Sequence, residues 1–153
     1  MTGRIVQINI SDGGVPKTPV PSARITANGV EGDRQEDRNH HGGPDRAVSL
    51  FSLEIIERLR AEGHPIAPGT AGENLTIAGL DWPTIKPGAR LVFEGGVVLE
   101  IASYCSPCST IRDSFSDLNS KRIKQEMHPG ESRLYARVIT EGAVSGGEVV
   151  RVV

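Results

Sequence analysis

The chain has 153 residues, of which 37% are hydrophobic and 24% charged, and its formal net charge is −2 at pH 7. A near-neutral globular composition of this kind gives no field that would attract nucleic acid or a membrane surface, and we expect neither as a partner. The length fits one domain over residues 1–153, and no apolar run approaches the roughly 20 residues that cross a bilayer.

The first half of the chain predicts strands and one helix. Residues 4–10 alternate apolar and polar side chains, as a strand does, and residues 23–27 could form a second short strand. The polar stretch 29–44 has no usable periodicity, and apolar character resumes at residues 46–51. Ser52 then offers a helix cap, with an apolar stripe following it at Leu53, Ile56 and Leu59 and a stop at Gly63.

The second half predicts more strands, with helical spacing between them. Residues 75–77 look like a strand, and residues 90–93 and 97–102 flank Glu94-Gly95-Gly96, the clearest hairpin signal. Apolar residues recur at helical spacing over 111–118, and a short helix is expected over 120–127. Residues 134–139 and 149–153 are strands. About seven short strands and two or three short helices, without regular alternation, predict a mainly β fold: a barrel with helices at its ends.

The first candidate site is the charged loop 32–46. Arg38 and Arg46 supply forked hydrogen-bond donors for an anion, while Gly42 lets a backbone amide approach an oxygen closely. His40 and His41 could donate, accept or bind a metal. The alternative is a solvated loop with local ion pairs, which is the usual role of a charged surface segment.

The second candidate site is the pair Cys105 and Cys108, which follows a strand and precedes a helical pattern. The N-terminus lacks the apolar region of a signal peptide, so we expect a cytoplasmic protein, in which such a pair is more often reactive or metal-binding than a disulfide. Cys108 is placed at the start of the predicted helix, where a thiolate is stabilised. Cys105 could resolve a persulfide. The alternatives are two packing cysteines, or a zinc site that recruits a histidine from the first loop.

Two weaker candidates remain. In the stretch 69–75, Asn74 lies beside glycines and could hydrogen-bond a ring or an amide, although Thr70 and Glu73 could equally form a capping pair. Arg137 lies on the predicted strand 134–139, where an arginine usually faces solvent and, if it faces inward, needs an anionic partner.

These segments together resemble the MOSC domain family, named for the C-terminal domain of molybdenum cofactor sulfurase. The string Asp37-Arg38-Asn39-His40-His41-Gly42-Gly43-Pro44-Asp45-Arg46 resembles its first signature. Gly72-Glu73-Asn74-Leu75 resembles the second, and Lys86-Pro87-Gly88 followed by Pro107-Cys108 the third. The segments occur in the family's order over nearly the whole chain. One departure is Cys105, where the stand-alone members of the family tend to carry arginine.

The resemblance implies a MOSC-type β-barrel in which Cys108 is the functional cysteine and the molybdenum ligand. Molybdenum cofactor (molybdopterin) is then the expected ligand, with Arg38, Arg46 and Arg137 at the pterin phosphate. His40, His41, Gly42 and Asn74 would contact the pterin or the oxo groups. The family also implies reduction of N-hydroxylated substrates, for which an external electron-donor reductase would be needed. The alternatives are a sulfur carrier that receives a persulfide on Cys108 from a cysteine desulfurase, and a non-catalytic interaction module.

Overall fold

Seven strands close into a barrel in the computed structural model, which describes residues 1–34 and 43–153. In chain order they are β1 (Thr2–Ile10), β5 (Val48–Ser52), β6 (Leu75–Ala78), β7 (Arg90–Phe93), β8 (Val98–Cys105), β9 (Arg133–Thr140) and β11 (Val149–Val152). Around the barrel the order is β11, β7, β8, β9, β5, β6 and β1, and the pairing of β1 with β11 closes it. Only β5 and β6 are parallel among these pairs, so the barrel is mixed, and the predicted mainly β barrel is confirmed.

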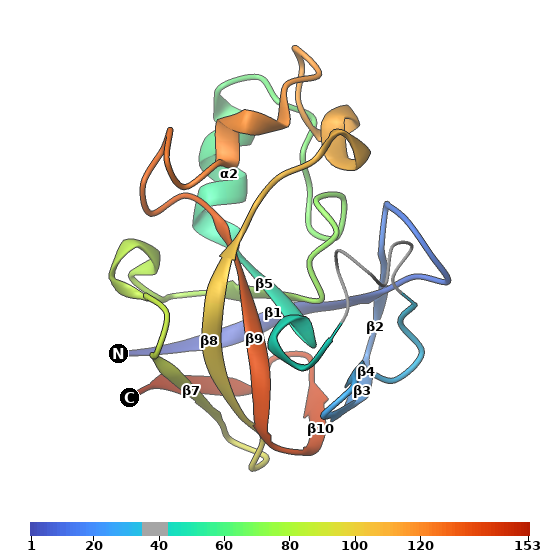
Figure 1. The fold of residues 1–153 in the computed structure, drawn as a ribbon, viewed down its shortest axis with the longest axis vertical. Coiled ribbons are helices and arrows are strands. Elements are labelled where there is room, and N and C mark those ends of the chain that lie inside the picture. The colour runs from blue at the N-terminus through green and yellow to red at the C-terminus, as the bar shows by residue number, and fades with distance from the viewer. Residues whose placement is uncertain (35–42) are drawn as a thin grey trace.

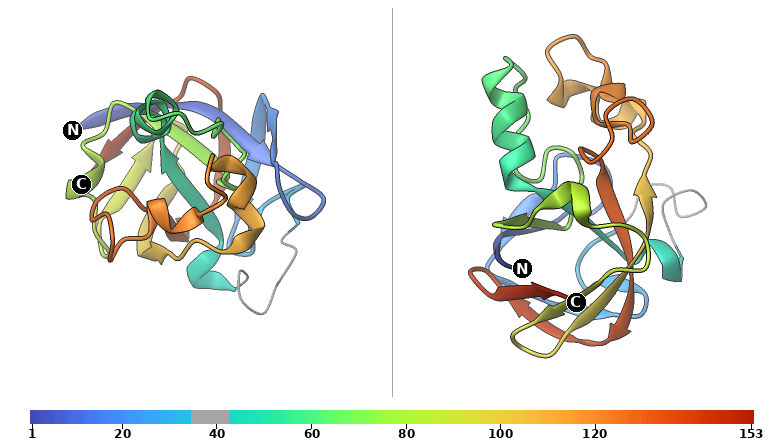
Figure 2. Two further views of the ribbon diagram at one scale, coloured as in Figure 1. Left: turned by 90° about the horizontal axis from the view of Figure 1, so that it is seen from above. Right: turned by 90° about the vertical axis from the view of Figure 1, so that its left-hand side faces the viewer.

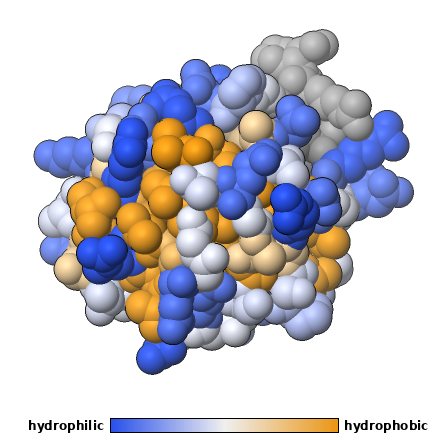
Figure 3. All heavy atoms as spheres, turned by 90° about the horizontal axis from the view of Figure 1, so that it is seen from below, coloured by the Kyte–Doolittle hydropathy of each residue, from blue (hydrophilic) through white to orange (hydrophobic). Residues whose placement is uncertain are grey.

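Four shorter strands lie outside the closed barrel. The strand β2 (Thr18–Val20) extends the sheet beyond β1, while β3 (Ser22–Thr26), β4 (Gly29–Val30) and β10 (Gly142–Ser145) form a small separate sheet. In Figure 1 this small sheet lies beside the barrel, and the two chain ends lie close to each other on the opposite side. The underside of the molecule shows apolar patches broken up by hydrophilic side chains (Figure 3).

The barrel interior is filled by aliphatic side chains that alternate along the strands. Leu50, Ile77, Leu91, Leu99 and Leu134 are all at most 2% exposed, as the period of a half-buried strand requires. In β1 the alternation of buried and exposed side chains changes at a bulge between residues 5 and 7. The buried face therefore differs from the one that unbroken alternation over residues 4–10 predicts, and residue 6 is 44% exposed.

The helix α2 (Leu53–Ala61) begins where the sequence predicts. Ser52 caps it by accepting a hydrogen bond from the backbone N–H of Ile55 at 3.3 Å, and Ile56 and Leu59 are fully buried. Gly63 follows with a φ of 103°, a left-handed conformation that suits glycine at a helix end. The remaining helical turns are 3-10: η1 (Pro44–Arg46), η2 (Trp82–Thr84), η3 (Ser109–Ser114) and η4 (Ser120–Ile123).

The two helices expected after Pro107 are therefore shorter and tighter than the apolar spacing predicts. Phe115 is buried, but its N–H bonds to the carbonyl of Arg112, three residues back, and its own backbone is extended. Leu118 is 60% exposed and has a positive φ of 59°, so the third position of the predicted stripe faces away from the core. The six residues of η3 are enough to bury Ile111 and to bring Phe115 into the core, after which the chain turns away.

At one end of the barrel, α2 lies beside the segment that carries η3 and η4 (Figures 1 and 2), and an ionic cluster joins the two. The guanidinium of Arg122 bonds both oxygens of Glu62, at 3.1 and 2.9 Å, and also binds Glu131, which Arg58 contacts at 2.7 Å. The bond from Arg122 lowers the pKa of Glu62 below its ordinary value. Burial works to raise the pKa of Glu131, but the two arginines outweigh it and lower that pKa. The cluster therefore stabilises the fold most at pH values where both carboxyls are ionised.

Within the described ranges, none of the helices has the length and apolarity that a membrane span requires.

Candidate functional site

A cavity of about 720 Å³ lies where the β1–β2 connection, the outer face of β5 and β9, and the segment after β8 come together. Its wall includes a thiol, a phenol ring and several cationic side chains: Cys108, Tyr135, Lys17, Arg34, Arg46 and Arg133. Pockets that take small organic ligands usually measure roughly 300–1,000 Å³, so this one has room for a cofactor-sized molecule.

Strand alternation explains which side chains reach the cavity. Ser49 on β5 and Tyr135 on β9 are direct partners and both line it, while their neighbours Leu50 and Leu134 pair on the core side. Arg133 shares the face of Tyr135, because side chains two residues apart in a strand point the same way. The cavity therefore lies on the outside of the barrel wall and not in its centre.

Cys108 is half-buried in the cavity wall, just after the end of β8, and forms no disulfide. Its backbone is extended, and its carbonyl accepts hydrogen bonds from Ser120 Oγ at 2.9 Å and from the N–H of Ile111 at 3.3 Å. These bonds fix the loop on both sides while leaving the sulfur accessible. The first turn of η3 follows, as predicted, although it is 3-10 and short.

Cys105 has the opposite environment. It is 1% exposed at the end of β8, opposite Arg133, and does not line the cavity. Burial, followed by the neighbouring Cys105 thiol, raises the pKa of the Tyr135 hydroxyl above its ordinary value. Tyr135 therefore keeps its proton at neutral pH. The two cysteines differ sharply in their access to a ligand, because Cys108 lines the cavity and Cys105 does not.

The cations of the cavity are held in different ways. Lys17 forms a nearly buried ion pair with Asp33, contacting both carboxylate oxygens at 2.7 Å. Arg46, from η1, lies over the Tyr135 ring with its guanidinium carbon 5.5 Å from the ring centre. Arg34 is exposed at the rim. Asp33 offsets the charge of Lys17, so it is the arginine guanidiniums near the thiol that suit an anionic ligand.

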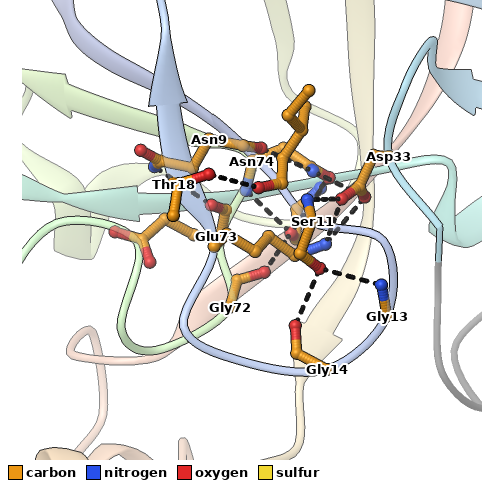
Figure 4. A network of polar contacts seen from close by, with 12 residues as sticks. Asn9, Ser11, Gly13, Gly14, Thr18, Asp33, Gly72, Glu73 and Asn74 are labelled. Carbon is orange, nitrogen blue, oxygen red and sulfur yellow. Dashed lines mark hydrogen bonds and ion pairs between the residues drawn. The ribbon is translucent and has the colours of Figure 1, made fainter.

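Asn74 is the centre of a polar network behind the cavity wall (Figure 4). Its amide nitrogen donates to the carbonyl of Asn9 at 3.2 Å and to Asp33 at 2.9 Å. Its oxygen accepts from the backbone N–H and the hydroxyl of Ser49 at 3.1 and 3.2 Å. Since Asn74 is 2% exposed and all these groups are already engaged, its side chain positions Asp33 and Ser49.

Glu73 points away from the cavity into a buried cluster. It is fully buried and accepts a hydrogen bond from Thr76 Oγ1 at 2.9 Å, while Asn9 donates to the same hydroxyl. Burial raises the pKa of this carboxyl, and the amides of Gly69 and of Glu73 itself oppose the rise. Glu73 thus supports the loop beneath Asn74, and Thr70 bonds Ala67 instead of pairing with it as a cap.

Of the residues that the sequence singles out, Cys108, Arg46 and Asn74 line one cavity. Arg137 does not: it lies on the same face of β9 as Arg133 but further along, where Asp45 and Glu100 bind it. The predictions for Arg38, His40, His41 and Gly42 fall outside the described residues. In residues 1–34 and 43–153, no three His, Cys, Asp or Glu side chains gather as a metal site would require.

Sequence reasoning missed Arg133, Tyr135 and Lys17. Arg133 and Tyr135 precede Arg137 by four and two residues, so strand alternation alone was a signal that they share its face of the strand. No local pattern marks Lys17, because it reaches the cavity only through the long turn between β1 and β2 and its pair with Asp33.

Comparison with known proteins identifies the family. The model of the MOSC domain matches residues 37–151. An uncharacterised protein, YflK, of Bacillus subtilis is 31% identical over 138 residues, and protein YiiM of Escherichia coli is 27% identical over 126 residues. These matches cover 88% and 79% of this chain but only 60% and 54% of those relatives.

Solved structures support the same assignment. YiiM from Geobacillus stearothermophilus has a TM-score of 0.79 and 25% identity, covering 99% of this chain and 75% of that one. The YuaD protein of Bacillus subtilis has a TM-score of 0.80 at 19% identity, covering 99% and 96%, which shows a shared fold. With the closed barrel and the family model in agreement, the chain belongs to the MOSC domain family.

Proposed function

We propose that this protein binds a molybdenum-pterin cofactor in the cavity beside Cys108. The observation that carries the proposal is that an accessible, unpaired thiol shares a cavity of about 720 Å³ with several cationic side chains. A deprotonated sulfur is a good ligand for a soft metal, and cationic side chains suit a ligand that bears phosphate.

The described residues fit such a group in three respects. The space is large enough for a small organic cofactor. Cys108 offers sulfur from a loop held by two backbone bonds, so the ligand atom is held in place before binding. Arg133 in the wall is 6% exposed, and among the described residues its guanidinium bonds one carbonyl, which leaves donors for an anion.

The residues of this chain would divide the work of binding. Cys108 would ligate the metal, and Arg46 and Arg34 would face the anionic parts of the cofactor. Asn74 and Asp33 would hold Lys17 and Ser49 in the wall. When bound, the cofactor supplies two-electron redox chemistry at the metal. Reduction of N-hydroxylated bases, with electrons from a separate reductase, is the activity we propose for the loaded protein.

The test is the metal content of the protein from two kinds of cell. Protein purified gently from cells that make the cofactor is expected to carry molybdenum approaching one atom per chain. Protein from cells that cannot make it should carry none, and should take up the metal when incubated with released cofactor. If protein from producing cells holds no molybdenum and the apoprotein takes up none, the proposal is wrong.

A second candidate function is sulfur transfer, favoured by the contrast between an accessible Cys108 and a buried Cys105. In this function a cysteine desulfurase would place a persulfide on Cys108. After incubation with such an enzyme and cysteine, intact mass should show one added sulfur, and fragmentation of the peptide that holds both cysteines should place it on Cys108 and not on Cys105. Absence of both molybdenum and added sulfur would leave an interaction module without chemistry.

A further inference from the structure

Arg133 is a buried cation that the described residues leave largely unpaired. The residue is 6% exposed, yet its side chain forms one hydrogen bond within residues 1–34 and 43–153, from Nη1 to the carbonyl of Ala71 at 2.7 Å. Its Nε is fully buried and has no acceptor, and in the part of the chain that the structure describes no carboxylate forms an ion pair with it. A guanidinium carries five N–H donors, so most of them lack a partner.

A buried charge without a counter-ion is one of the costliest features a fold can keep. Glu73 is a buried carboxyl whose pKa the charge of Arg133 acts to lower, but the two side chains form no ion pair. Burial raises the pKa of Glu73 above its ordinary value, which favours the neutral acid. Since Glu73 forms no ion pair with Arg133 and bonds Thr76 instead, the guanidinium remains open to an anion from outside the protein.

The location of Arg133 allows such an anion to reach it. The residue lines the cavity on the same face of β9 as Tyr135. Across from it, Gly72 has a φ of 80°, and a side chain there would begin 3.2 Å from Val15 Cγ1 and 3.9 Å from Arg133 Nη1. A glycine at this position keeps the space above the guanidinium open.

We propose that Arg133 forms the main binding subsite for a tetrahedral oxoanion, a phosphate or sulfate group, in this cavity. A planar fork of N–H donors matches two oxygens of such a group, which a lysine ammonium cannot do. The inference deepens the proposed function, because it places the anionic end of the cofactor at Arg133 and its metal end at Cys108. It does not require the metal, so the metal-free protein should bind a free oxoanion.

The experiment is a thermal unfolding titration of cofactor-free protein with inorganic phosphate, against sodium chloride at matched ionic strength. Wild type should show a saturating rise in Tm with phosphate that chloride does not reproduce, because a ligand that binds only the folded state stabilises it. Arg133→Met should lose this rise and have an unchanged or higher Tm without phosphate. Arg151→Met, an exposed arginine on β11 away from the cavity, should respond as wild type.

Two results would overturn the subsite: equal effects of phosphate and chloride on wild type, or a full phosphate response in Arg133→Met. If Arg133→Met does not fold, Arg133→Lys provides the test. Its phosphate affinity is expected to be at least about threefold weaker than that of wild type, and an unchanged affinity would contradict the subsite. A phosphate monoester as a second probe distinguishes the sources: tighter binding than phosphate indicates an esterified group, equal binding a free ion. Molybdenum uptake that fails while phosphate still binds rejects only the proposed function.

Discussion

Cys108→Ser is expected to lower the molybdenum bound per chain at least about tenfold, because a serine hydroxyl stays protonated and is a poor ligand for a soft metal. The substitution replaces the sulfur atom by oxygen and leaves the shape of the cavity wall nearly unchanged. The carbonyl of residue 108 can still accept from Ser120 and Ile111, so the loop should keep its conformation. The measurement is molybdenum by elemental analysis against protein concentration, with both proteins purified from cofactor-producing cells.

Cys105→Ser is the matched control, since it changes the same atom three residues away. Cys105 is 1% exposed and outside the cavity, so this variant should keep most of the metal even if it loses some stability. Equal molybdenum in wild type and Cys108→Ser would remove Cys108 as the ligand. Loss confined to Cys105→Ser, in a variant with a normal melting curve, would reverse the roles assigned to the two thiols.

Asn74→Asp should cost about 3 kcal/mol or more of unfolding free energy at neutral pH. The change replaces an amide that donates to Asn9 and Asp33 by an oxygen that cannot donate, and places it 2.9 Å from the Asp33 carboxylate. The lost bond to Asn9 is buried, and the part-buried bond to Asp33 goes to a charged group, the kind whose loss costs most. Like charges at that distance add repulsion. Urea unfolding followed by circular dichroism gives the difference.

Asn28→Asp provides the comparison, because Asn28 is exposed in the turn before β4 and its side chain makes no hydrogen bond to the described residues. Its effect should stay within about 0.5 kcal/mol. A loss below about 1 kcal/mol for Asn74→Asp would mean that the network does not stabilise the cavity wall. In that case Asn74 would be free to contact the ligand, as the sequence alone suggested.

The barrel could be predicted from the sequence because its signals are local. The Glu94-Gly95-Gly96 turn lies between β7 and β8, and Ser52 caps α2, as residue patterns indicate. The helical spacing of Ile111, Phe115 and Leu118 predicted too long a helix, since the short 3-10 helix η3 buries Ile111 and Phe115 follows directly after its end. The spacing of apolar residues in a sequence indicates which side chains are buried, but not the length or type of the helix that they belong to.

The candidate site could be predicted only in part, because its wall depends on contacts between distant segments. Cys108 and Arg46 each lie in a recognisable sequence motif, and both line the cavity. The choice between Arg133 and Arg137 could not be made from β9 alone, where both have the same parity. The choice depends on Glu100, which lies on β8 directly opposite Arg137, and on Asp45 of η1, which also bonds Arg137.

The central claim is that the cavity beside Cys108 holds the cofactor, and site-resolved alkylation tests it most directly. Iodoacetamide labelling of loaded and cofactor-free protein, read by peptide mass spectrometry, reports the access to each thiol separately. Cys108 should be labelled in the cofactor-free protein and protected at least about tenfold in the loaded one, while buried Cys105 stays unlabelled in both. The same labelling rate for Cys108 in both proteins, with molybdenum present in one, would contradict the account.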